Sequence, residues 1–316
     1  MDLLLANWFA KLQSHSYLEP FRFPDLNIPN LNLFVKRDDL IHPEISGNKL
    51  RKLKGNLLAA RTSAKVHQIV TFGGAYSNHL LASAAAAHEL QLSIIGVVRG
   101  EELSAQSNPV LAKCEALGMQ LQFVSRTEYQ KQKHTNGYDN QNGFKTWYIP
   151  EGGANAHSLL GCREIYNESF LQHHYKDFDL VCIAQGTTTT SLGILSILKP
   201  TTKLLVVPVL KGFDSLAEMQ KLAQIAKQNP YTNRFEFPFH QVEVLSEFHH
   251  GGYAKTTPEL LQFTKQFNAT NQFPIEPVYT AKALFALKAY LIENQEKISN
   301  SPKPIEILFV HTGGIV

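Results

Sequence analysis

Lys49 is the residue of this sequence best placed for covalent chemistry on a carbonyl carbon. It follows Gly47-Asn48 and opens a helical pattern, because the leucines after it recur at the spacing of one helical face (Leu50, Leu53, Leu57 and Leu58). The positive end of a helix dipole and apolar neighbours both disfavour an ammonium group, so both lower the pKa of Lys49, as Schiff-base chemistry requires. The alternative is a solvated lysine among four basic residues, and this stretch alone favours that alternative.

A run of hydroxyl side chains after a glycine indicates an anion-binding turn. At the start of a predicted helix, Gly186 is followed by five of them: Thr187, Thr188, Thr189, Thr190 and Ser191. Backbone N–H groups and hydroxyls at such a position suit a phosphate monoester. The turn contains no Lys or Arg, which disfavours a nucleotide P-loop. A helix cap needs only one or two such residues, so five in succession favour an anion site.

Two further features could contact a ligand. Ser77-Asn78-His79 lies between two glycines and an Ala-rich helical pattern, so it could bind a carboxylate or a ring oxygen, or it could only cap the helix. This turn alone does not separate the two interpretations. Tyr253 and Tyr279 each end a loop before a predicted helix. Each tyrosine alone fits a structural role, whereas the pair could transfer protons near a cofactor.

The elements that would position these residues alternate along the chain. Val- and Ile-rich runs predict strands at 68–72, 93–98, 120–124, 180–184, 204–209, 241–245 and 305–310. Helical patterns lie between them, at 48–60, 78–90, 109–117, 158–173, 189–198, 215–229, 258–267 and 280–295. This alternation predicts an α/β fold with parallel sheets covered on both faces, whose ligands bind where glycine-rich turns follow strands. Residues 131–143 are rich in Asn, Gln and Gly and predict an irregular, exposed loop.

The composition is that of a globular protein with one large or two moderate domains. The chain has 316 residues, 44% apolar and 18% charged, and a net charge of +3. This small charge, without a long basic run, argues against a nucleic-acid partner. The thirteen histidines do not have the spacing of metal ligands, so no metal site is predicted. Three scattered cysteines, no signal peptide and no apolar run long enough to span a membrane predict a cytoplasmic protein.

Together these motifs resemble a family of pyridoxal-phosphate enzymes of the tryptophan-synthase-β fold type (fold type II). The branch in question contains 1-aminocyclopropane-1-carboxylate (ACC) deaminase and D-cysteine desulfhydrase. Six motifs carry the resemblance, in the family's order along almost the whole chain: Lys36-Arg37-Asp38-Asp39, Gly47-Asn48-Lys49-Leu50-Arg51-Lys52-Leu53, Ser77-Asn78-His79, Glu151-Gly152-Gly153, Pro277-Val278-Tyr279 and His311-Thr312-Gly313-Gly314. The second motif is specific to this branch, and the others are persuasive only together.

The resemblance implies a role for each candidate residue. Lys49 would bind pyridoxal 5'-phosphate covalently and, once displaced, act as a base. Asn78 would contact the ring hydroxyl, and the substrate carboxylate would be bound by Ser77, Asn78 and His79. The phosphate would be held by the segment Gly186, Thr187, Thr188, Thr189 and Thr190. Tyr279 and Tyr253 match the proton-transfer tyrosines of the family, and the candidates beside the pyridine nitrogen are Thr280 and Thr312.

The resemblance also implies an architecture of two αβα domains with the cofactor in the cleft between them. The larger domain would comprise residues 1–50 and 160–316, and the smaller domain residues 51–159. By the same resemblance we expect a homodimer that acts on a small amino acid.

Thr280 decides which activity the resemblance favours. ACC deaminase has a glutamate directly after the tyrosine that matches Tyr279, and a neutral hydroxyl there would make the ring a weaker electron sink. Elimination from D-cysteine, to pyruvate, sulfide and ammonia, is therefore favoured over ring opening of ACC to 2-oxobutyrate and ammonia. Tyr76 and Ala281 also depart from the family pattern, which has glutamine and glycine there. The same scaffold could also serve a serine dehydratase or racemase, or a non-catalytic protein that binds pyridoxal phosphate.

Overall fold

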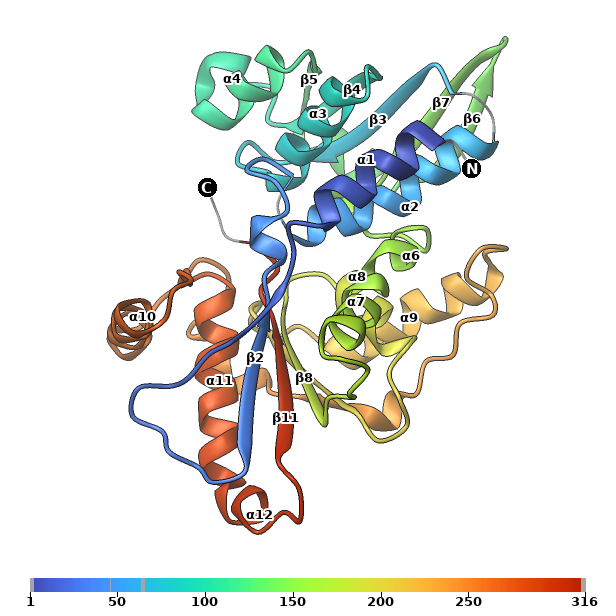
Figure 1. Ribbon diagram of the computed structural model, residues 1–316. Helices are drawn as coiled ribbons and strands as arrows, with labels where there is room; N and C mark the ends of the chain where they lie inside the picture. The colour runs from blue at the N-terminus through green and yellow to red at the C-terminus, as the bar shows by residue number, and fades with distance from the viewer. Residues whose placement is uncertain (1–2, 46, 64–65, 314–316) are drawn as a thin grey trace.

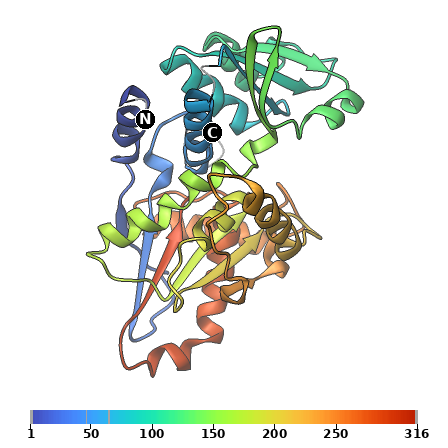
Figure 2. The ribbon, with the colours of Figure 1, turned by 90° about the vertical axis from the view of Figure 1, so that its right-hand side faces the viewer.

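Two mostly parallel sheets organise the protein. The computed structural model describes residues 3–45, 47–63 and 66–313, so Gly314 of the last motif lies outside the described residues. Figure 1 shows the two sheets at opposite ends of the molecule, and helices α2 (Asn48–Ser63) and α6 (Ser158–Cys162) lie between them. The view in Figure 2, turned by 90°, shows the same two-part arrangement. The α/β fold with two parallel-sheet layers predicted from the sequence is confirmed.

The larger sheet has six strands in the order β1-β2-β11-β8-β9-β10. Its strands are β1 (Leu18–Pro20), β2 (Leu31–Lys36), β8 (Leu180–Gln185), β9 (Lys203–Pro208), β10 (Val242–Val244) and β11 (Ile305–Val310). Every pair is parallel except β1 with β2. All six residues of β8 are buried, as expected of a central parallel strand covered by helices on both faces.

The smaller sheet has five strands in the order β5-β4-β3-β7-β6. They are β3 (Gln68–Gly73), β4 (Ser93–Arg99), β5 (Gln120–Val124), β6 (Gly137–Gln141) and β7 (Phe144–Ile149). Only β6 and β7 pair antiparallel. The carboxyl ends of β3 and β7 are neighbours, which brings the turns after them to one edge of the sheet.

The remaining helices cover these sheets, and several begin at side-chain caps. They are α1 (Leu3–Gln13), α3 (Asn78–Glu89), α4 (Pro109–Ala116), α5 (Arg126–Gln132), α7 (Glu164–Gln172), α8 (Thr189–Leu195), α9 (Ser215–Gln228), α10 (Pro258–Thr270), α11 (Thr280–Glu293) and α12 (Gln295–Ser299). Ser77 caps α3 and Asp214 caps α9, each by accepting a backbone N–H three residues later. Within the described residues, no helix is both long and apolar enough to cross a bilayer.

Two expectations from the sequence are wrong. Residues 131–143 are not an irregular loop, because they contain β6 and the turn into β7. The turn is Asn142-Gly143, with positive φ at both residues (52° and 87°), as the type I′ hairpin turn requires. The predicted helix 158–173 is two helices, α6 and α7, which meet at Arg163.

Helix α1 packs on the smaller sheet's side of the molecule. Leu5, Phe9 and Leu12 belong to the same hydrophobic cluster as Ile69 of β3 and Leu81 of α3. These contacts associate α1 with the smaller of the two predicted domains. The predicted domain boundaries stay a prediction: a larger domain of residues 1–50 and 160–316 and a smaller domain of residues 51–159.

Candidate active site

A cavity of about 240 Å³ lies between the two sheets. Its walls include the turns that follow β3, β7, β8 and β11, which is where ligands of parallel sheets bind. It brings together ten of the candidate residues predicted from the sequence: Lys49, Ser77, Asn78, His79, Gly186, Thr187, Thr190, Tyr253, Tyr279 and Thr312. Among the described residues, Thr188, Thr189 and Thr280 are the candidates that do not line it.

Lys49 projects into this cavity from the first turn of α2. Its ammonium nitrogen donates a hydrogen bond to Oδ1 of Asn48 at 2.8 Å. Burial lowers the pKa of Lys49 to about 7, and the nearby charge of Lys52 lowers it further in the same direction. Lys49 lines the cavity and is only partly exposed, which argues against the solvated lysine considered as an alternative. A pKa near 7 leaves part of its amine neutral and nucleophilic at that pH.

Gly47 lets the start of α2 approach the turn after β11 closely. Its φ is +59°, and a Cβ atom there would lie 1.8 Å from the carbonyl oxygen of Thr312. The same carbonyl accepts the N–H of Asn48 at 3.2 Å. A side chain at position 47 would therefore separate Lys49 from the turn that contains Thr312.

Lys52 is a cavity residue that the sequence interpretation missed. Its Nζ atom donates to Oγ1 of Thr187 at 2.8 Å and to the carbonyl oxygen of Gly152 at 3.1 Å. The side chain is 2% exposed, and burial lowers its pKa to about 8. The signal was present, because residues three apart lie on one side of a helix and Lys52 follows Lys49 at that spacing.

The turn between β8 and α8 fits a phosphate group. Thr187 and Thr190 line the cavity, and Lys52 brings a positive charge to Thr187. Of the buried hydroxyls in this turn, that of Thr190 faces the cavity, and its protein neighbour is the thiol of Cys162, a weak hydrogen-bonding group. A hydroxyl with so weak a partner can bond a stronger acceptor such as a phosphate oxygen. The residues present are therefore compatible with a bound phosphate monoester.

Thr280 is engaged in the turn before α11. Its hydroxyl lies 3.1 Å from Oε1 of Glu276, and it accepts the backbone N–H of Glu276 at 2.9 Å. The side chain is fully buried. Of the two threonines expected beside the pyridine nitrogen, Thr312 lines the cavity and Thr280 does not.

Tyr253 and Tyr279 form a pair of phenols at one side of the cavity. Their ring centroids are 5.9 Å apart, with planes inclined by 68°. Burial raises the pKa of Tyr279, and the neighbouring Tyr253 raises it further. A Cβ atom at Gly186 would lie 2.9 Å from Cε1 of Tyr279, so this glycine allows the phenol to reach the phosphate turn. Tyr279 is thus a protonated hydroxyl at neutral pH.

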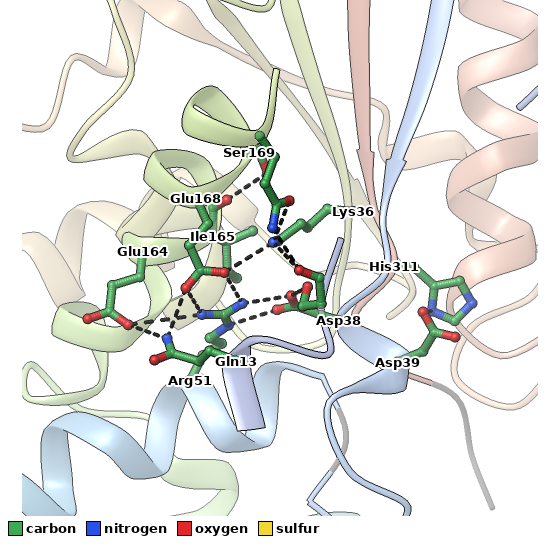
Figure 3. A network of polar contacts seen from close by, with 12 residues as sticks. Gln13, Lys36, Asp38, Asp39, Arg51, Glu164, Ile165, Glu168, Ser169 and His311 are labelled. Carbon is green, nitrogen blue, oxygen red and sulfur yellow. Dashed lines mark hydrogen bonds and ion pairs between the residues drawn. The ribbon is translucent and has the colours of Figure 1, made fainter. Parts of the chain in front are cut away.

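A buried ion network anchors the first turns of α2 to the larger sheet. Arg51 donates Nε and Nη2 to the carboxylate of Asp38, at 2.9 and 2.8 Å. It also donates Nη1 and Nη2 to Glu168 of α7, at 2.6 and 2.8 Å, and Glu168 pairs with Lys36 of β2 at 3.1 Å. Figure 3 shows Arg51 between the two carboxylates. Arg51 is two residues from Lys49, so the network fixes the position of that lysine.

Comparisons with known proteins place the chain in a family. No family model matches the chain. The chain is 30% identical to a Pyrococcus horikoshii protein provisionally named 1-aminocyclopropane-1-carboxylate deaminase, over 97% of this chain and 94% of that protein. It is 29% identical to the mitochondrial bifunctional D-cysteine desulfhydrase/1-aminocyclopropane-1-carboxylate deaminase of Arabidopsis thaliana, over 92% of this chain and 75% of that protein.

Solved structures that resemble this chain include a member of the same family. A crystal structure of an ACC deaminase homologue matches 98% of this chain and 94% of its own, with a TM-score of 0.69 and 26% identity. A pyridoxal 5'-phosphate-dependent aspartate racemase matches 99% of this chain and 94% of its own with a TM-score of 0.62 but 15% identity, which is a likeness of fold alone. Because a relative 30% identical is matched along nearly its whole length, the chain belongs to the ACC deaminase/D-cysteine desulfhydrase family of fold type II enzymes.

Proposed function

We propose that this protein is a pyridoxal-phosphate-dependent lyase that acts on a small amino acid, with D-cysteine as the leading substrate. The observation that carries the proposal is a lysine of pKa about 7, Lys49, in one cavity with a phosphate-compatible turn. The names of the relatives support both D-cysteine desulfhydrase and ACC deaminase as activities. A homodimer and a cytoplasmic location stay predictions from the sequence.

The cofactor would be held by groups on both sides of the cavity. Lys52 and the hydroxyls of Thr187 and Thr190 would bind the phosphate, since a buried ammonium and neutral hydroxyls complement a dianion. Asn78 would donate to the ring hydroxyl, and Thr312 would lie beside the pyridine nitrogen. When bound, pyridoxal phosphate supplies an electron sink for the electron pair released from a bond at the substrate's Cα.

The residues of the chain would then bind the substrate and move its protons. Ser77 and Asn78 would hold the carboxylate at the turn after β3. Lys49 Nζ, neutral in part near pH 7, would accept the proton from Cα. Tyr279, which keeps its proton at neutral pH because burial and Tyr253 raise its pKa, would donate a hydrogen bond to the leaving sulfur.

D-cysteine is preferred over ACC because both threonines considered for the pyridine nitrogen are neutral. A hydroxyl leaves that nitrogen less protonated than a carboxylate would, so the ring withdraws electrons less strongly. Sulfide is a good leaving group and needs less assistance than the carbon–carbon bond of a cyclopropane ring. This argument supports the desulfhydrase over its ACC deaminase alternative.

The substrate assignment is tested by adding D-cysteine, ACC and D-serine separately to the protein loaded with pyridoxal phosphate. We expect sulfide and pyruvate from D-cysteine in equal amounts. Formation of 2-oxobutyrate from ACC at a higher kcat/KM would establish the deaminase instead. Equal turnover of D-serine would indicate a dehydratase, and a bound cofactor with no product from any of the three would contradict the proposal.

Lys52→Met is expected to weaken binding of pyridoxal phosphate by about 10- to 100-fold, because a hydrogen bond to a charged group contributes about 1.5–3 kcal/mol. Equilibrium titration of the cofactor-free protein, followed by absorbance, measures the dissociation constant. Lys54→Met is the matched control, since Lys54 lies on the same helix and pairs with Glu164 at 2.7 Å outside the cavity. Equal affinities for the two variants would contradict a phosphate role for Lys52.

A further inference from the structure

The two tyrosines of the cavity are held in different ways. Tyr279 begins helix α11, and the carboxylate of Glu276 accepts its backbone N–H at 3.0 Å and that of Thr280 at 2.8 Å. Tyr253 ends the turn Gly251-Gly252-Tyr253, which belongs to no helix or strand, and both glycines have positive φ (93° and 112°). The start of the helix therefore fixes Tyr279, whereas the position of Tyr253 depends on what holds this turn.

Lys282 holds the turn on α11. Its Nζ atom donates to the carbonyl oxygen of Gly252 at 2.7 Å. Gly252 directly precedes Tyr253, and Lys282 follows Tyr279 by three residues, so it lies on the same side of the helix. The rings of the two tyrosines meet edge-on, with their centroids 5.9 Å apart. One hydrogen bond thus joins the helix to the turn directly beside the pair of phenols.

Aromatic contacts continue one turn further along the helix. The ring of Phe285 packs edge-on against His250, with centroids 4.9 Å apart, and lies 6.3 Å from the ring of Phe248. The segment 248–253 therefore runs antiparallel to α11. Its first residues have rings to pack on the helix, but Gly252 has no side chain. The ammonium of Lys282 is the contact that acts at the glycines next to Tyr253.

The burial of Lys282 is not explained by the stability of the fold. The residue is fully buried, which is rare for a lysine, and its ammonium donates to a backbone carbonyl rather than to a carboxylate. Burial lowers its pKa, because the charged form is disfavoured there. The carbonyl of Gly252 also accepts the N–H of Lys255 at 3.1 Å, so removal of Lys282 would not leave it without a partner. An apolar side chain would serve the fold equally well.

We propose that Lys282 is a positioning residue for the cavity, which fixes the carbonyl of Gly252 on α11 and thereby sets the phenol of Tyr253 beside that of Tyr279. Within the described part of the chain, the tyrosines line the cavity and Lys282 does not, so the lysine acts through Tyr253. The inference rests on the proposed function for the use of the phenols in the reaction. The placement of Tyr253 does not depend on it.

The first test measures this placement by NMR of the full chain with labelled tyrosine. The wild-type protein should show a nuclear Overhauser effect between the rings of Tyr253 and Tyr279. Lys282→Met keeps nearly the same shape without the donor, so it should lose this signal. Lys288→Met is the control, because Lys288 lies on the same helix but pairs with Asp25, at 2.6 Å. An unchanged signal in Lys282→Met would overturn the proposal.

The second test separates positioning from stability, in the protein loaded with pyridoxal phosphate. Lys282→Met should lower kcat for D-cysteine by about 10- to 100-fold, because a small misplacement of a group in the site has an effect of this size. Urea unfolding of the same variant should show no loss of stability. In Tyr253→Phe, which already lacks the hydroxyl, the added change Lys282→Met should lower kcat by less than about threefold.

Three results would contradict a positioning role. A Lys282→Met protein that is less stable than wild type, or does not fold, would show that the lysine serves the fold. An effect on kcat that adds in full to that of Tyr253→Phe would show that it does not act through this phenol. An unchanged kcat would show that the reaction does not need Tyr253 to be held.

Failure of the inference and failure of the proposed function are distinguishable. If the wild-type protein turns over no amino acid but the signal between the two tyrosines is lost in Lys282→Met, the proposed function fails and the placement of Tyr253 stands. If D-cysteine is turned over and Lys282→Met keeps both the signal and the wild-type kcat, the inference alone is wrong.

Discussion

Lys49→Ala is expected to abolish covalent binding of pyridoxal phosphate and to lower turnover by more than about 1,000-fold. The variant loses both the nucleophilic amine and the base, and a positioned base alone contributes about 10²- to 10⁴-fold. Borohydride reduction followed by mass spectrometry of the peptides measures the linkage, and the assay with D-cysteine measures turnover. The linkage should be found on the peptide that contains Lys49 in the wild-type protein and on no peptide of the variant.

The pH dependence of the linkage gives the same prediction a second measurement. The neutral amine is the nucleophile, and the pKa of Lys49 is about 7. The linkage rate should therefore rise as the pH increases through 7 and level off above it, whereas an ordinary lysine, of pKa about 10.4, would still be gaining reactivity at pH 10. Lys54→Ala is the control, and it should keep the wild-type profile. A rate that continues to rise to pH 10, or full turnover by Lys49→Ala, would show that another residue binds the cofactor.

Much of this site follows from local sequence patterns. The alternation of Val- and Ile-rich runs with helical patterns predicts parallel sheets, and the turns after parallel strands meet at the ligand-binding edge. Ser77, Thr187 and Thr312 come together for that reason, although they are far apart in the chain. The Asn142-Gly143 pair is itself a strong local signal for a hairpin and could have predicted the turn between β6 and β7. The polar residues around it lack the apolar alternation of a strand, so β6 was not predicted.

Other features depend on contacts that the sequence does not reveal. Thr280 follows the tyrosine of its motif, but its hydroxyl is bound to Glu276 four residues earlier, and only the geometry of the turn shows this. Nε2 of His79 contacts the hydroxyl of Thr71 at 2.8 Å, and that hydroxyl donates to the carbonyl of Ile149, which pairing of β3 with β7 brings beside it. A motif therefore locates a side chain but does not say which of its atoms is already engaged.

The network around Arg51 is the clearest case of a role decided by distant residues. In the sequence, Arg51 is one of three basic residues that follow Lys49 within five positions. The two carboxylates that it hydrogen-bonds, those of Asp38 and Glu168, are 13 and 117 residues away, in different elements. Arg51, Asp38 and Lys36 are all fully buried, and the two positive charges balance those of Asp38 and Glu168. A planar guanidinium can donate paired hydrogen bonds to two carboxylates at once, whereas a lysine ammonium lacks this fork of donors.

Arg51→Met is accordingly expected to destabilise the protein by about 3 to 5 kcal/mol, because it leaves the fully buried carboxylate of Asp38 without its guanidinium partner. Urea unfolding at pH 7.5 measures the loss. The matched control is Arg126→Met, since the pair of Arg126 with Glu102 is exposed on both sides, and such pairs contribute about 0 to 1 kcal/mol. Equal losses for the two variants would contradict a special role for Arg51.

The pH dependence of the Arg51→Met deficit identifies its cause. Burial alone would raise the pKa of Asp38, but Arg51 outweighs it, and the pKa is lowered below its ordinary value of 3.8. The native protein therefore gains stability from Asp38 above pH 4 and loses it as the pH falls through the lowered pKa. In Arg51→Met, burial acts without the guanidinium, so the pKa of Asp38 should rise and the carboxyl should be neutral already in mild acid. The deficit relative to wild type should therefore begin to shrink in mild acid, above pH 4, where protonation removes the unpaired charge of the variant. It should shrink further below about pH 4, where the wild type loses the contribution of its own ionised Asp38. A deficit independent of pH would instead assign the loss to the packing of the arginine side chain, and the neutral double variant Asp38→Asn/Arg51→Met would then be no more stable than Arg51→Met.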